Sequence, residues 1–189
     1  MFTLNYVYTL PFFKNGHGLA ANALKGWELS GIVSAYTGAA FTVTTSGADP
    51  AGLGVIASGT QSASRPDLVC DPTAGFSRTY GGSAQSAAQG LGWFNTACFA
   101  AVPQGTVRPG NSGRGVIRGP GFFNVDASLI KNVKITEKMS MQVRGESFNT
   151  LNWVNPSSFA SLNNTATNFG QINNFRAPRR VQVALKLIF

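Results

Sequence analysis

The final segment of the chain, residues 179–189, alternates largely between apolar and polar side chains. Its odd-numbered positions carry the apolar set Val181, Val183, Leu185, Leu187 and Phe189. Its even-numbered positions carry Arg180, Gln182, Ala184, Lys186 and Ile188, which are largely polar. A period of two is that of a β-strand with one apolar face, and eleven residues are about enough for a tilted strand to cross a bilayer. The segment therefore predicts a strand of membrane-spanning length.

Four upstream segments show a similar alternation, so we predict five strands in all: 2–10, 26–45, 122–132, 137–149 and 179–189. In the fourth, Met139, Met141 and Val143 share one face, opposite a face with polar side chains. A soluble sandwich would bury the apolar face in a core. A wide barrel would turn that face to lipid and the polar face to an aqueous lumen. Alternation alone does not separate these two folds.

The predicted connections differ in length in a regular way, which favours the barrel. The connections at 11–25 and 132–136 are the shorter ones, whereas 46–120 and 150–178 are long. Long loops without secondary structure are uncommon in compact soluble domains, and outer-membrane barrels alternate short periplasmic turns with longer extracellular loops. We therefore expect an all-β fold, an antiparallel transmembrane β-barrel segment with two long extracellular loops.

Charge and cysteine content exclude several other classes of protein. The net charge is +8, but the basic residues form three groups at predicted strand ends and do not make the continuous face that nucleic-acid binding needs. Cys70 and Cys98 lie 28 positions apart and His17 is the single histidine, so we expect neither a Cys/His metal site nor a cofactor. A disulfide within the long loop is the favoured interpretation in an oxidising compartment, and two free buried thiols are the alternative.

The sequence lacks the common motifs of catalytic sites. The chain has neither a phosphate-binding P-loop motif nor a G-x-S-x-G nucleophile motif, and His17 lies in a Gly-flanked predicted turn. Asp126, Arg144 and Glu146 share the polar parity of neighbouring strands. They could be read as paired carboxylates for hydrolysis, but we favour a ladder of charges that lines a lumen. We therefore expect a protein that is not an enzyme.

An ordered series of short segments extends over nearly the whole chain: 26–32, 37–43, 65–69, 93–99, 113–126, 146–152, 169–172 and the terminal Phe189. In this series the chain resembles the end of a TonB-dependent receptor, and it is most similar to the Oar-like branch, whose members carry a carboxypeptidase-regulatory-like domain. The resemblance implies a barrel of about 22 strands in the bacterial outer membrane that takes up a scarce nutrient. The plug and the TonB-contacting segment of such receptors have no counterpart in this sequence.

The resemblance also implies a set of partners. These are outer-membrane lipid, the remainder of the barrel and its plug, and the barrel-assembly machinery. The last strand of the chain would be the segment that this machinery recognises. TonB would act only through sequence upstream of this chain, and no nucleic acid is expected. Residues 1–20 lack the features of a signal peptide, so we expect Met1 to be an internal or truncated start. The main alternative is a soluble β-sandwich adhesin or carbohydrate-binding module.

Overall fold

The computed structural model describes residues 1–11, 25–46, 49–52, 64–74 and 93–189. They divide into two compact units. Unit 1 comprises Met1–Thr37, Phe122–Asn155 and Ala177–Phe189, and unit 2 comprises Gly38–Gly121 and Pro156–Arg176. Regular structure in the described residues consists of strands and one 3₁₀ turn, η1 (Thr96–Cys98). Among these residues, no helix is long and apolar enough to span a membrane.

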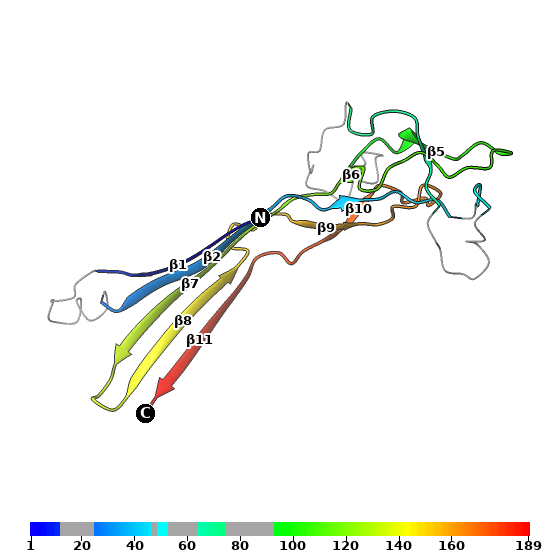
Figure 1. Cartoon of the computed structure of the whole chain (residues 1–189). Coiled ribbons are helices and arrows are strands. Elements are labelled where there is room, and N and C mark those ends of the chain that lie inside the picture. Colours follow the sequence, from blue (N-terminus) through cyan, green and yellow to red (C-terminus); the bar gives the residue numbers. More distant parts are fainter. Residues whose placement is uncertain (12–24, 47–48, 53–63, 75–92) are drawn as a thin grey trace. The chain divides into compact units, whose positions relative to one another are not determined.

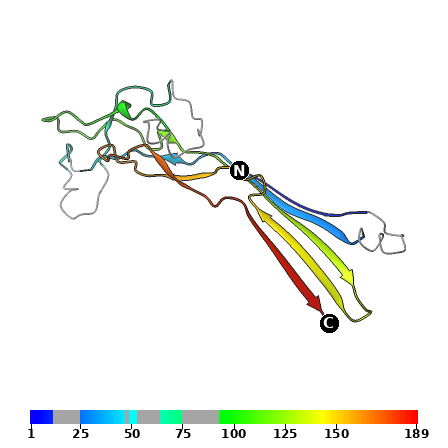
Figure 2. The ribbon, with the colours of Figure 1, turned by 180° about the vertical axis from the view of Figure 1, so that it is seen from behind.

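Unit 1 is a single antiparallel sheet of five strands in the order β1-β2-β7-β8-β11 (Figure 1; Figure 2). The strands are β1 (Phe2–Thr9), β2 (Trp27–Tyr36), β7 (Phe122–Lys134), β8 (Ser140–Phe148) and β11 (Arg180–Ile188). A tight turn joins β7 to β8, in which the Ile135 and Thr136 N–H groups donate to the Met139 carbonyl at 2.9 and 3.0 Å. Within the described residues, β1 and β11 are the edges of an open sheet.

The register keeps the same parity on each side of this sheet from edge to edge. Leu4 pairs with Val33 and Val33 with Val125, while Leu129 pairs with Gly145 and Gly145 with Val183. Even-numbered residues of β1 and odd-numbered residues of the other four strands therefore share one side, which we call the apolar face. The opposite parity forms the polar face. The alternation in the sequence therefore gives the whole sheet one apolar face and one polar face.

Gly31 lies at a crowded point on the apolar face. A Cβ atom at this position would meet the Asp126 carbonyl oxygen at 2.4 Å and the Tyr6 hydroxyl at 2.6 Å. Tyr6 is the register partner of Gly31, so its ring crosses the space that a side chain on β2 would occupy. A glycine is needed here for the close approach, and the aromatic neighbour covers it.

Unit 2 contains three short antiparallel strand pairs. They are β3 (Ala40–Phe41) with β6 (Ile117–Arg118), β4 (Asp67–Leu68) with β5 (Phe99–Ala100), and β9 (Pro156–Phe159) with β10 (Ile172–Phe175). Its buried core consists of Val43, Phe94, Cys98, Phe99, Ile117 and Phe159. Phe94 makes edge-to-face contacts with Phe99, Phe159 and Phe169 at centroid distances of 5.6, 5.8 and 5.4 Å, within the range that aromatic pairs prefer.

One expectation from the sequence needs correction. The strand predicted at 26–45 ends at Tyr36, and Ala40–Phe41 pairs with Ile117–Arg118 in unit 2. A Cβ at Gly38 would lie 1.8 Å from the Gly119 carbonyl oxygen, so the two backbones meet where only glycine fits. The regions expected as long loops, 46–120 and 150–178, contain short strands in their described parts and contribute to a hydrophobic core. Most of the predicted connection at 11–25, with His17, lies outside the described residues.

Candidate functional site

On the apolar face of unit 1, the side chains of the edge strand β11 are exposed. On β11, Val181, Val183, Leu185 and Leu187 are 68%, 76%, 63% and 47% exposed. A soluble sandwich would require these four side chains to pack against a second sheet in a shared core. Within the part of the chain that the structure describes, nothing buries them in this way. An exposed apolar stripe of this extent marks a surface that meets another apolar phase.

Aromatic side chains lie near both ends of the apolar face. At one end the Lys131 Nζ atom lies 5.3 Å from the centroid of the Trp27 ring and donates a hydrogen bond to the Lys25 carbonyl. At the other end the Phe123 and Trp153 rings meet edge to face at 5.9 Å. Aromatic rings and lysines with an apolar stem favour the boundary between hydrocarbon and water.

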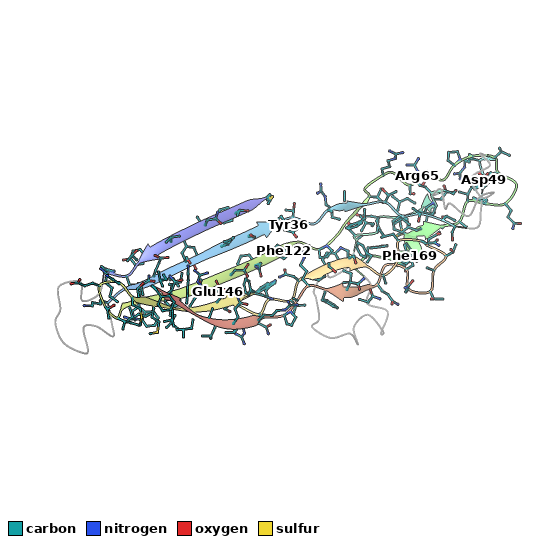
Figure 3. The ribbon with its side chains drawn as sticks, turned by 90° about the horizontal axis from the view of Figure 1, so that it is seen from below. Tyr36, Asp49, Arg65, Phe122, Glu146 and Phe169 are labelled. Carbon is teal, nitrogen blue, oxygen red and sulfur yellow. A yellow bond between two sulfur atoms is a disulfide. The ribbon has the colours of Figure 1, made fainter. Side chains whose placement is uncertain are left out.

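The polar face carries a small network between β8 and β11. Arg144 Nη1 lies 3.4 Å from Glu146 Oε1, and Arg144 Nη2 donates to Gln142 Oε1 at 3.2 Å. Gln182 on β11 donates its side-chain N–H to Glu146. An open groove of about 390 Å³ follows this network, lined by Gln142, Arg144, Glu146, Gln182, Ala184 and Lys186. Figure 3 marks Glu146 on the sheet. The arrangement is that of a polar surface with a paired charge.

Asp126 has a different role from the one expected. It shares the parity of Arg144 and Glu146, but the register pairs Ser128 with Glu146, so Asp126 lies beyond the ion pair. Its Oδ1 atom accepts hydrogen bonds from the Asn149 N–H and the Asn124 side chain, both at 2.8 Å. Asp126 therefore holds the turn that follows β8. That this face lines a lumen stays a prediction for all three residues.

The sequence reasoning missed the function of Asn149, which is 6% exposed. Its φ is +51°, a left-handed conformation that asparagine tolerates better than most residues. The Asn149 side chain accepts from the Trp153 N–H at 2.8 Å and donates to the Trp153 carbonyl at 2.9 Å. An Asn pair in the segment Asn149–Asn152 is a turn signal that could have pointed to it.

In unit 2 the strongest polar contact joins Asp67 to Arg108. Both Nη atoms donate to the carboxylate oxygens at 2.7 Å, and the Asn111 N–H adds a bond of 2.9 Å. The hydrogen bonds from Arg108 and from the Asn111 backbone lower the pKa of Asp67 from its ordinary 3.8 to about 2. This bidentate ion pair holds the segment around residue 67 against the segment at 108–111.

The disulfide prediction is confirmed. Cys70 and Cys98 are bonded, with their Cα atoms 5.0 Å apart. Cys98 is fully buried in the core of unit 2, next to Phe94 and Phe99. The alternative of two free buried thiols is therefore wrong. Among the described residues there is no cluster of three metal-ligating side chains.

Comparison with known families decides the class of the protein. A family model described as an outer membrane beta barrel domain matches residues 1–182. The chain belongs to this outer-membrane β-barrel family. Its location is accordingly the bacterial outer membrane, which confirms the predicted fold class and location. Comparisons with curated proteins and with solved structures gave no match.

Family membership indicates how the five-stranded sheet of unit 1 is oriented across the membrane. We infer that the tight turn between β7 and β8 lies at the periplasmic end, because outer-membrane barrels keep their short turns on that side. Trp27 at the start of β2 and Lys131 near the end of β7 belong to this end. Phe123, near the start of β7, is at the opposite end, which is extracellular on the same inference. The two segments of unit 2 follow β2 and β8 in the chain.

Proposed function

We propose that this chain forms barrel wall and extracellular loops of a TonB-dependent receptor of the Oar-like branch, which takes up a scarce nutrient. Family membership supports the barrel, and the ordered series of segments described above supports the receptor branch. In each of two of those segments, one residue makes a contact that explains why that residue type is present. Asp67, in segment 65–69, binds Arg108, and Asn149, in segment 146–152, holds the turn after β8.

The observation that carries the receptor assignment is that unit 2 has its own core. Its buried core side chains, aromatic cluster and disulfide stiffen loops that face the outside. A rigid extracellular surface loses little conformational entropy when a ligand binds, which is an advantage for a receptor.

The proposal also assigns partners. Outer-membrane lipid contacts the apolar face, and the polar face, with Arg144 and Glu146, faces the lumen, where a plug would lie. Further barrel strands join the edges β1 and β11, since an open edge leaves unpaired backbone groups that are unstable in lipid. The apolar stripe Val181–Phe189 would serve as the signal for the assembly machinery. TonB would act through upstream sequence, and no catalytic step is assigned to this chain.

Growth under nutrient limitation tests the receptor assignment. A strain that lacks the gene is compared with the parent strain on iron chelates, glycans and peptides as limiting nutrients, and each comparison is repeated in a strain that lacks TonB. We expect a defect on at least one nutrient, of the same size in the two mutants. A solute that enters through the protein equally well without TonB would show a passive pore and would overturn the assignment.

A further inference from the structure

The turn that follows β8 presents apolar side chains to the surroundings, although it is held rigidly. Leu151, Trp153 and Val154 are 59%, 56% and 50% exposed. Turns exposed to water are normally polar. Three large apolar side chains together on an ordered turn therefore indicate a contact surface.

Hydrogen bonds fix the position of Trp153 within this turn. Asn149 and Asn152 both have left-handed backbones, with φ of +51° and +52°. The Asn149 side chain binds both the N–H and the carbonyl of Trp153. The indole ring then packs edge to face on Phe123, at the extracellular end of the apolar face. The position of this exposed tryptophan is therefore preorganised.

The same turn positions a cation. The Arg179 N–H donates to Asn152 Oδ1 at 3.0 Å, and one Nη atom reaches the Thr150 carbonyl at 3.4 Å. The other N–H groups of this guanidinium have no hydrogen-bond partner among the described residues. Arg179 directly precedes β11 and has the same parity as Val181, which lies on the apolar face.

The periplasmic end of the same face carries a comparable pair, Trp27 with Lys131. Phe123 and Lys131 are eight positions apart on β7, or about 26 Å along a strand that rises about 3.3 Å per residue. At the tilt of barrel strands this corresponds to a height of about 20 Å, close to the apolar band of such barrels. The turn after β8 thus lies where the hydrocarbon ends and the lipid head groups begin.

We propose that Trp153 and Arg179 form a binding site for the phosphate-bearing head group of a lipid in the outer leaflet. The indole ring lies at the level of the upper acyl chain, and the guanidinium donates to phosphate oxygens, which it matches in geometry. Lipid is the occupant because the site continues the lipid-facing surface without a break. The exposed Leu151 and Val154 suit acyl chains and not a dissolved anion.

Neighbouring arginines offer a matched test. Arg180 follows Arg179 directly, but it pairs with Phe148 on the opposite, polar face. Arg179→Gln and Arg180→Gln variants would be extracted from the outer membrane in mild detergent, and the phosphorylated lipid that copurifies would be measured by mass spectrometry. We expect Arg179→Gln to lower the bound lipid about tenfold, as for the loss of a charge-assisted hydrogen-bond pair, and Arg180→Gln to leave it unchanged. Equal amounts of lipid in both variants and the parent would overturn the proposal.

Trp153 itself supplies a second measurement that does not depend on a variant of Arg179. A protein with Trp27 and Trp93 replaced by Phe is reconstituted in bilayers whose lipids carry bromine either near the ester group or near the end of the acyl chain. We expect bromine near the ester to quench Trp153 several times more strongly than bromine at the chain end. Absence of quenching by either lipid, or stronger quenching from the chain end, would contradict the assigned position.

Discussion

Both terminal nitrogens of Arg108 donate hydrogen bonds to the carboxylate of Asp67, each at 2.7 Å from an oxygen. The pair joins two parts of unit 2 that are far apart in the sequence, and Asp67 is only 7% exposed. Because a glutamine cannot reproduce this two-point contact, we expect Arg108→Gln to loosen unit 2. On the proposed extracellular location of unit 2, its cleavage by proteinase K on whole cells should become severalfold faster.

Arg114 provides the control for that experiment. It is exposed, and no hydrogen bond or ion pair joins it to the rest of the described residues. Arg114→Gln removes the same charge from the same unit and should leave the cleavage rate unchanged. Equal acceleration in both variants would mean that the charge itself matters and not the contact with Asp67.

The pH dependence of unit 2 follows from the same pair. The pKa of Asp67 is about 2 in the folded state and 3.8 is its ordinary value. A lowered folded pKa contributes stability that is complete above the unfolded pKa and is lost as the pH falls through the folded pKa. The contribution of Asp67 should therefore hold from neutral pH to about 4 and decline between about 4 and 2. Urea unfolding followed by Trp93 fluorescence, with Trp27 and Trp153 replaced by Phe, measures it.

An Asp67→Asn variant supplies the comparison for the pH experiment, because an amide does not titrate. This variant should be less stable than the parent at neutral pH, and the difference should shrink as the pH falls toward 2. A stability difference that stays constant over the whole range would show that the charge of Asp67 contributes nothing.

Loss of the disulfide should destabilise unit 2 by about 3 to 4 kcal/mol, from the chain entropy of a loop of this length. Cys70 is exposed and Cys98 is fully buried. Cys70→Ser should therefore show this effect alone, whereas Cys98→Ser should be more destabilising, because it also places a hydroxyl in the aromatic core. Urea unfolding of both variants measures the difference. Equal losses would mean that the core around Cys98 tolerates a polar atom.

The turn after β8 should depend on both features of Asn149. Asn149→Ala loses the side-chain hydrogen bonds and places a residue with a less favourable left-handed backbone there, at about 2 to 3 kcal/mol in total. Asn149→Gly keeps the backbone conformation and should lose about half as much. The free energy of unfolding in urea tests the order. A glycine variant that is less stable than the alanine variant would exclude backbone strain as a cause.

The strands of the barrel sheet were predictable because their signal is local. The alternation in 122–132 and 179–189 depends on which side of a strand each residue faces, and that is set by neighbours in the sequence. The stretch after Tyr36 was not predictable in the same way. Phe41, Thr42 and Val43 read as a continuing strand, but the close approach of Gly38 to Gly119 directs them into unit 2.

Contacts over long sequence distances explain the rest of what the sequence did not reveal. The core of unit 2 brings Val43, Phe94 and Phe159 together, and no periodic pattern links these positions. Asp126 carried a parity that suggested a ladder with Arg144, yet its partner is the backbone of Asn149. Parity predicts the face of a side chain, whereas the register and the neighbouring turn decide what it binds.

Two adjacent residues in the middle of β11 test most directly whether the apolar face meets lipid. Val183 lies on the apolar face and Ala184 on the polar face, so an arginine at either site adds the same charge to the same strand. At the centre of the bilayer a lipid-facing arginine costs about 2 to 4 kcal/mol. We predict that Val183→Arg sharply lowers the amount of folded protein in the outer membrane, measured by its resistance to denaturation in cold detergent, while Ala184→Arg assembles normally. Normal assembly of Val183→Arg, or a worse defect in Ala184→Arg, would contradict the account.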